Sequence, residues 1–233
     1  MINEIDGLKF KIYEKFIMND KSELKFRNST FSSYTKRNNK YIIKTSGKIV
    51  SNPTFLGGIT SHNLDYFLQR LYEDLQILIN KEDFLNFAQI LTIEFKKDII
   101  PEYDKNTSIS KLHEKLHESS NKNQILFYSS KNIGFNNGIV IKPIAKTTGK
   151  SYIIYSKLAE LKAHKSSNPT YFEQFELQYL EEIKNLLRFE VRFVKFADLK
   201  KALQLSNRKE IYAKDVFFSK INVVQNEFEK FLK

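Results

Sequence analysis

Apolar and polar residues alternate along the start of the chain, which is the pattern of half-buried β-strands. Leu8, Phe10 and Ile12 alternate with lysines and a tyrosine, and residues 40–50 are rich in β-branched and aromatic side chains. Residues 28–39 between them are polar and short of core positions, which predicts a mobile hairpin or loop. We therefore expect an antiparallel sheet from the N-terminal part onward.

The clearest helix is predicted over residues 63–79, where apolar residues recur at helical spacing. The apolar positions are Leu64, Phe67, Leu68, Leu71, Leu75, Leu78 and Ile79. Asn63 is suited to the N-cap, and Asp65 lies in the first turn. A strand is predicted next over residues 89–96, with Glu94 on its polar side.

Strands and helices interleave in the second half of the chain. The patterns predict a helix over 107–118, strands over 124–128, 138–141 and 150–155, a helix over 172–183, a strand over 187–193 and helices from 196 onward. Each half then ends in a strand with a central glutamate, which suggests a pseudo-duplication. We expect an α+β domain over residues 1–196, with antiparallel sheets and helices packed on one face, and a helical C-terminal element over 197–233.

Composition and charge favour a polyanionic partner. The 38 basic and 27 acidic residues give a net charge of +11, and 14% of the residues are aromatic, which together favour nucleic acid. The chain has no cysteine, which excludes disulfides, thiolate zinc sites and cysteine nucleophiles. No export signal and no run of about 18 apolar residues occurs, so we expect a cytoplasmic protein without a membrane partner.

Residues 113–117 match the H-E-x-x-H pattern of zinc hydrolases through His113, Glu114 and His117. Lys115 lies inside the motif and would place a cation close to the metal at an electrostatic cost. The same helix carries an apolar stripe, so histidines that flank this stripe in solvent are the favoured interpretation. Zinc hydrolysis is the third hypothesis for function.

Two segments of the second half carry the candidate chemistry. Tyr155 closes one predicted strand and is followed by Lys157 and Glu160. Three charged residues share one face of the strand over 187–193, namely Arg188, Glu190 and Arg192. Taken alone, Tyr155 is a packed strand aromatic, and the charges form a ladder of cross-strand ion pairs. Taken together in a basic chain, these residue types indicate a nucleophile, a metal ligand and phosphate-binding groups.

Residues 152–162, Tyr-Ile-Ile-Tyr-Ser-Lys-Leu-Ala-Glu-Leu-Lys, and residues 187–193, Leu-Arg-Phe-Glu-Val-Arg-Phe, resemble the rolling-circle replication initiators of the filamentous-phage gene II type. That family carries an aromatic-Tyr-x-Lys-x-x-Glu segment and then a hydrophobic-Arg-x-Glu-x-Arg strand. Residues 47–57, the long helix and residues 91–96 are similar to the earlier blocks of the family in the same order. The similarity spans roughly residues 40–195, and the order of its motifs is more specific than any one of them.

The resemblance implies an HUH-endonuclease-like scaffold with a degenerate His motif, because the strand that would hold the usual His-hydrophobic-His pair reads Thr-Ile-Glu-Phe at 92–95. It also implies an enzyme that nicks and religates DNA to start rolling-circle replication of a small phage or plasmid. A tyrosine hydroxyl attacks a backbone phosphate, stays joined to the 5′ end and leaves a 3′ hydroxyl. A phenol is a weak nucleophile near neutral pH, so a divalent cation and a nearby base must assist.

The resemblance implies a role for each candidate residue. The implied roles are catalysis for Tyr155 and Lys157, binding of Mg²⁺ or Mn²⁺ for Glu94, Glu190 and Glu160, and DNA binding for Arg188, Arg192, Lys162, Lys165 and Lys96. The expected partner is origin DNA, single-stranded or supercoiled, with a host helicase and polymerase as further candidates. The nick site and the oligomeric state are left open.

Tyr152 and Tyr128 are rival nucleophiles. Strand alternation places Tyr155 and Tyr152 on opposite faces, so only one of these two can meet the predicted carboxylates. A non-catalytic DNA-binding replication or regulatory protein on the same scaffold is the alternative function. Such a protein would depend mainly on lysine and arginine, and its DNA affinity would fall with salt.

Overall fold

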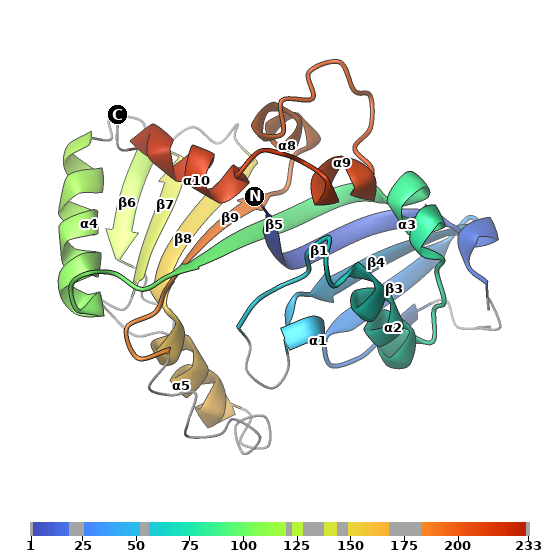
Figure 1. The fold of residues 1–233 in the computed structure, drawn as a ribbon, viewed down its shortest axis with the longest axis horizontal. Coiled ribbons are helices and arrows are strands. Elements are labelled where there is room, and N and C mark those ends of the chain that lie inside the picture. Colours follow the sequence, from blue (N-terminus) through green and yellow to red (C-terminus); the bar gives the residue numbers. More distant parts are fainter. Residues whose placement is uncertain are drawn as a thin grey trace. The chain divides into compact units, whose positions relative to one another are not determined.

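The computed structural model describes residues 2–18, 26–51, 56–119, 123–127, 138–143, 149–167 and 183–231. The predicted α+β class with antiparallel strands and C-terminal helices is confirmed (Figure 1). Nine strands are hydrogen-bonded in the order β2-β3-β4-β1-β5-β9-β8-β7-β6. The strands are β1 Glu4–Tyr13, β2 Phe26–Asn28, β3 Ser32–Arg37, β4 Lys40–Ser46, β5 Gln89–Ile99, β6 Asn123–Phe127, β7 Gly138–Pro143, β8 Lys150–Ser156 and β9 Leu187–Phe193.

Short helices connect and cover these strands. The α-helices of the described residues are α1 Lys48–Ser51, α2 Leu64–Leu75, α3 Lys81–Phe87, α4 Lys105–Ser119, α5 Lys157–Ser167, α8 Phe196–Ala202, α9 Ala213–Phe217 and α10 Val223–Phe228. Two single 3₁₀ turns are η1 Glu14–Phe16 and η2 Glu229–Phe231. No helix of the described chain is both long and apolar enough to cross a bilayer.

The chain forms two compact units. Unit 1 is Met1–Phe95 with Phe193–Val223, and unit 2 is Lys96–Arg192 with Val224–Lys233. Helices α8 and α9 belong to unit 1 together with the N-terminal strands, and the predicted domain boundary at residue 196 stays a prediction. Strands β5 and β9 each contribute residues to both units.

Residues 28–39 were predicted to form a mobile hairpin or loop rather than a strand, and the absence of a strand is wrong, because β3 occupies Ser32–Arg37 and forms a hairpin with β4. β3 pairs with β4 in an antiparallel register that sets Tyr34 opposite Ile43. The ring of Tyr34 is buried and lies 5.3 Å from the ring of Tyr41. A two-residue turn joins the strands, and Asn38 and Asn39 take positive φ angles of 46° and 58°, as tight hairpins require. One buried aromatic side chain and the turn residues thus outweigh the polar composition of this segment.

In unit 1, α2 and α3 cover one face of the N-terminal strands. Phe84 of α3 lies edge-on to Phe10 of β1 at 5.2 Å and to Phe67 of α2 at 5.8 Å. The helix predicted over 63–79 is shorter than expected, since α2 ends before Gln76, which adopts a left-handed φ of 59°. The Asn63 side chain does not cap the helix directly; it accepts the Thr60 N–H and donates to the Gly58 carbonyl.

In unit 2, β6, β7 and β8 form an antiparallel meander. The predicted strands over 124–128, 138–141, 150–155 and 187–193 and the helix over 107–118 are confirmed within a few residues at their ends. Ile109 and Leu116 form the buried side of α4. The helix predicted over 172–183 falls almost entirely outside the described residues.

Candidate active site

Strand β8 directs its two tyrosines to opposite faces of the unit 2 sheet, as predicted. Tyr152 lies with its ring 5.7 Å from that of Phe228 in α10, and Phe189 of β9 lies 5.1 Å from the same ring. α10 therefore covers this face. Because side chains alternate along a strand, Tyr155 of β8 and Glu190 of β9 belong to the other face.

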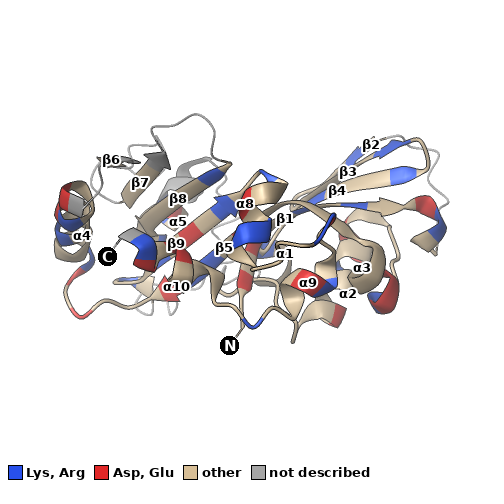
Figure 2. Ribbon diagram, turned by 90° about the horizontal axis from the view of Figure 1, so that it is seen from above, with Lys and Arg blue, Asp and Glu red and all other residues tan. Residues whose placement is uncertain are grey.

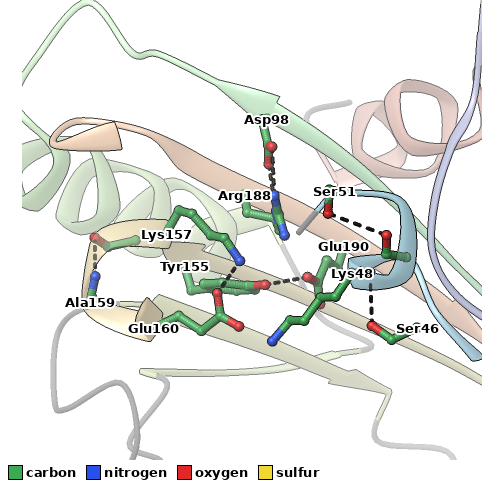
Figure 3. Close-up of polar contacts among 12 residues, drawn as sticks. Ser46, Lys48, Ser51, Asp98, Tyr155, Lys157, Ala159, Glu160, Arg188 and Glu190 are labelled. Carbon is green, nitrogen blue, oxygen red and sulfur yellow. Dashed lines mark hydrogen bonds and ion pairs between the residues drawn. The ribbon is translucent and has the colours of Figure 1, made fainter. Parts of the chain in front are cut away.

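On that face, Tyr155 and Glu190 meet. The Tyr155 hydroxyl donates to Oε1 of Glu190 at 2.5 Å, and both residues are buried (Figure 3). They lie 35 residues apart in the sequence, on strands that are neighbours in the sheet. The contact brings the two motifs of the resemblance together, since one motif contains the tyrosine and the other the glutamate.

Helix α5 begins immediately after β8 and holds the next pair. The Lys157 backbone N–H donates to the Leu186 carbonyl at 3.1 Å, and the Ser156 hydroxyl accepts the Ala159 N–H at 3.3 Å, which caps the first turn. The Lys157 side chain is completely buried and its ammonium pairs with Glu160, one helical turn later (Figure 3). The predicted lysine and glutamate are therefore paired with each other.

Arg188 is buried and binds a carboxylate that the sequence did not single out. Its Nε and Nη2 donate to the two oxygens of Asp98 on β5, at 2.7 and 2.8 Å. This bidentate geometry is the strong form of an arginine–carboxylate pair. Asp98 could have been suspected, because it lies on the same strand as Glu94, but no spacing rule connects residues 98 and 188.

These side chains form one group, which we call the buried cluster: Asp98, Tyr155, Lys157, Glu160, Arg188 and Glu190. All of these residues are buried except Asp98, which is partly buried, and buried ions persist only when they are paired and hydrogen-bonded. Glu160 pairs with Lys157, Asp98 pairs with Arg188, and Glu190 accepts from the Tyr155 hydroxyl. The cluster thus offers a phenol hydroxyl with a proton-accepting oxygen already in contact.

The predicted metal ligands are not gathered into one group. Among the described residues, no three His, Asp or Glu side chains are arranged to hold a metal ion. Glu160 and Glu190 already face the Lys157 ammonium and the Tyr155 hydroxyl. Glu94 lies in unit 1, where its Oε2 would be only 2.9 Å from a Cβ at position 7, so Gly7 makes room for it on the neighbouring strand. Binding of a divalent ion by these residues therefore stays a prediction.

The predicted DNA-binding residues differ in exposure. Arg192 and Lys162 are exposed, whereas Arg188 and Lys96 are buried and could reach a phosphate only after a rearrangement. The side chain of Lys165 and all of Tyr128 lie outside the described residues. Burial lowers the pKa of the Lys105 ammonium, and the nearby charges of Lys162 and Lys184 lower it further. Lys162 therefore belongs to a group of three lysines, two of which the sequence analysis missed.

A second tyrosine–glutamate pair occupies the opposite face of β8. The Tyr152 hydroxyl donates to Oε2 of Glu227 in α10 at 2.8 Å, and Lys150 pairs with the same oxygen at 2.9 Å. Lys230 pairs with the other oxygen of Glu227. Burial alone would raise the pKa of Glu227, but the donors Lys230, Lys150 and Tyr152 outweigh it and lower the pKa below its ordinary value. No sequence pattern pointed to Glu227.

The H-E-x-x-H segment lies on α4, as predicted. The rings of His113 and His117 are 6.1 Å apart between centroids, and Glu114 and His117 are exposed. Partial burial, and then the charge of His117, lower the pKa of His113. The buried residues Ile109 and Leu116 form the apolar stripe, which agrees with the favoured interpretation of flanking histidines.

Comparisons with known proteins complete the description of the site. No family model and no curated protein matches the chain. Among solved structures, the chain is similar to a rolling circle replication initiator protein from Geobacillus stearothermophilus, with 13% identity and a TM-score of 0.41 over 100% of this chain and 97% of that chain. A likeness of this degree carries no argument about function.

Proposed function

We propose that the chain is a replication initiator that nicks and religates DNA, with Tyr155 as nucleophile. One observation carries the proposal: the hydroxyl of Tyr155 donates to Glu190, so the phenol and a proton acceptor are already in contact. The two residues come from the two motifs on which the sequence resemblance rests, and the net charge of +11 suits a DNA substrate.

In the proposed step, Tyr155 passes its phenolic proton to Glu190 while its oxygen bonds to a backbone phosphorus. The bond between that phosphorus and the 3′ oxygen breaks, and the 3′ oxygen takes a proton from water to leave as a free hydroxyl, while Glu190 returns its proton to the hydroxide formed. The 5′ phosphate is then a phosphotyrosine ester, and attack by a 3′ hydroxyl reverses the step and religates the strand. General-base assistance of this kind contributes about 10²- to 10⁴-fold.

The other members of the buried cluster would position this pair. Arg188 bound to Asp98 fixes the strand that holds Glu190, and Lys157 bound to Glu160 fixes the turn after Tyr155. Arg192, Lys162 and Lys184 are exposed and would bind the DNA backbone. Because Tyr155 is only 6% exposed, DNA must displace its covering side chains to reach it.

The Mg²⁺ or Mn²⁺ that the resemblance implies remains a prediction. The carboxylates of the buried cluster already face protein donors, so we route no step through a metal ion. A nicking assay with Mn²⁺ and with EDTA tests the metal requirement directly.

A non-catalytic DNA-binding protein is the second candidate, and a specific observation favours it. Arg188 and Lys157 are fully buried and paired, which is the arrangement of a structural network. In that case Tyr155 would serve packing, and the exposed lysines and arginines would supply the whole affinity for DNA.

The experiment incubates the full chain with single-stranded and supercoiled DNA that carries the sequence around its coding region, with Mn²⁺ or with EDTA. The readout is a protein–DNA adduct that survives denaturing electrophoresis. Tyr155→Phe removes the proposed nucleophile, and Tyr152→Phe is the matched control, since it makes the same change on the same strand but on the other face.

We expect the adduct to disappear in Tyr155→Phe and to persist in Tyr152→Phe. Loss in Tyr152→Phe alone would move the nucleophile to the other face of β8, and persistence in both would direct attention to Tyr128. Salt-sensitive binding without an adduct under any metal condition would reject the nickase and favour the binding protein.

A further inference from the structure

One face of the N-terminal sheet of unit 1 is left open by the helices that cover the other. Phe10 points to the covered face, where it contacts Phe84 of α3. Figure 2 shows α2 and α3 on one side of β2, β3 and β4. Directly paired residues of antiparallel strands share a face, and so do residues two apart on one strand. The strand registers therefore give the composition of the open face.

The open face consists of three rows of residues across the strands. The rows are Tyr13, Lys40 and Arg37; then Lys11, Ile42, Thr35 and Phe26; then Lys9, Lys44, Ser33 and Asn28. Five of these eleven residues are basic, two are aromatic and none is acidic. On the neighbouring strand β5, the same face carries the carboxylate of Glu94, which lies beside Gly7. We call this surface the basic sheet face.

The cations of the basic sheet face are not neutralised within the described protein. None of the five forms an ion pair with another described residue. Lys40 instead lies over the ring of Tyr13, with its Nζ 4.7 Å from the ring centroid. Lys36, which alternation places on the opposite side of β3, pairs with Glu14 at 2.8 Å. The charge of the open face is therefore complementary to that of a polyanion.

The aromatic residues indicate which polyanion fits. Tyr13 is 45% exposed and Phe26 is 59% exposed. They lie in adjacent rows, Tyr13 on β1 and Phe26 on β2, the two outer strands of this four-stranded group. Exposed aromatic rings on a basic surface stack on unpaired bases, which only a single strand offers. A flat sheet face also lacks the helix or projecting ribbon that enters the major groove of a duplex.

We propose that the basic sheet face binds single-stranded DNA, with lysines and arginine on phosphates and with Tyr13 and Phe26 stacked on bases. This inference deepens the proposed function by naming a surface that holds the strand, and it rests on that function only in the choice of DNA as the polyanion. The surface belongs to unit 1, whereas Tyr155 and Glu190 belong to unit 2.

The first test measures binding of the full chain to a labelled oligothymidylate across a salt series by fluorescence anisotropy. The face variant is Lys9→Gln, Lys11→Gln and Lys44→Gln together. The matched control is Lys201→Gln, Lys209→Gln and Lys220→Gln, which removes the same charge from exposed lysines elsewhere in unit 1. Unfolding midpoints confirm that both variants fold.

We expect the face variant to bind at least about tenfold more weakly near 0.1 M salt, and its log–log salt slope to fall by about 2, because each lost phosphate contact on a single strand contributes about 0.7. The control should stay close to wild type. Tyr13→Leu should weaken binding by about tenfold, and Tyr13→Phe, which keeps the ring, should not. Equal weakening in the face and control variants would overturn the proposal.

Competition with heparin, a polyanion without bases, tests whether the basic sheet face binds single-stranded DNA through base stacking or binds any polyanion through charge alone. If heparin displaces the oligothymidylate readily and Tyr13→Leu has no effect on oligothymidylate binding, the assignment to single-stranded DNA is wrong. Tyr155→Phe should retain binding in the same assay. A chain that binds through this face but forms no adduct would reject the nickase alone, whereas a chain that forms the adduct and binds normally in the face variant would reject this inference alone.

Discussion

The two faces of strand β8 carry the same pair of residue types in different surroundings. On one face the Tyr155 hydroxyl donates to Glu190, and the neighbouring charges are the fully buried Arg188 and Lys157. On the other face the Tyr152 hydroxyl donates to Glu227, which two lysines also contact, one of them with its side chain 54% exposed. A tyrosine–glutamate hydrogen bond by itself therefore does not identify a catalytic pair.

The two carboxylates differ in where their donors lie. Glu227 accepts from Lys230 in η2 and from Lys150 and Tyr152 in β8, and these donors lower its pKa, so it attaches the C-terminal end of the chain to the sheet. Glu190 accepts from the Tyr155 hydroxyl, and the nearby cations Lys157 and Arg188 bind Glu160 and Asp98. The proposed function assigns proton transfer to Glu190 and a structural contact to Glu227.

The largest expected effect comes from removing the proton acceptor. Glu190→Gln should lower the rate of adduct formation by about 10²- to 10⁴-fold, because an amide accepts a hydrogen bond but does not take up the proton. Glu227→Gln, the same change on the other face, should leave the rate within about threefold of wild type after correction for the folded fraction. Similar rates for the two variants, measured by a time course of adduct formation, would contradict the distinction.

Breaking the buried pair beside Tyr155 should have the largest effect on stability. Arg188→Met leaves Asp98 without its bidentate partner and should lower the free energy of unfolding by about 3–5 kcal/mol. Denaturant unfolding measures this value. The double variant Arg188→Met with Asp98→Leu removes both charges and should recover a large part of the loss. If the single variant is as stable as wild type, the pair is not desolvated as the structure indicates.

Glu227→Gln should lower the free energy of unfolding by about 1.5–3 kcal/mol near neutral pH, since it weakens hydrogen bonds to charged groups. The folded-state pKa of Glu227 lies below its ordinary value of 4.5, so its contribution is present above that pH and is lost as the pH falls through the folded-state pKa. The difference between wild type and the variant should therefore shrink below about pH 4.5, as followed by denaturant unfolding across pH. A difference in the free energy of unfolding between wild type and Glu227→Gln that grows as the pH falls would show that the pKa of Glu227 is not lowered in the folded state.

The smallest effects are expected from the tyrosine hydroxyls themselves. Tyr152→Phe and Tyr155→Phe each delete one buried hydrogen bond and should each lower the free energy of unfolding by about 1 kcal/mol. In Tyr152→Phe, Glu227 keeps its two lysine partners, so the loss should not exceed that of one hydrogen bond. Thermal melts of the two variants side by side provide the measurement, and a loss of several kcal/mol in either variant would contradict the expectation.

The sequence by itself determined the strands over residues 150–155 and 187–193 and the face of each strand on which a given side chain lies. Period-two alternation in residues 150–155 and 187–193 is enough to place Tyr155 and Glu190 on strands and Tyr152 on the face opposite Tyr155, because side-chain direction in a strand follows from position alone. The apolar stripe of α4 could also be predicted from the sequence, and it indicated that the histidines of the H-E-x-x-H motif flank the buried side of the helix. By contrast, the polar composition of residues 32–37 concealed β3, whose formation depends on the burial of a single tyrosine against β4.

Only the tertiary structure decided which charges meet. Asp98 and Arg188 form an ion pair although they are 90 residues apart in the sequence, and Glu227 and Tyr152 form a hydrogen bond although they are 75 residues apart. No local spacing in the sequence predicts contacts between such distant segments. Burial was also decided at this level: Arg188 and Lys96 read as phosphate-binding cations in the sequence, but the packing of their strands removes both from solvent. A residue type specifies the chemistry that a side chain can perform, whereas its exposure and partners depend on how separate strands are brought together.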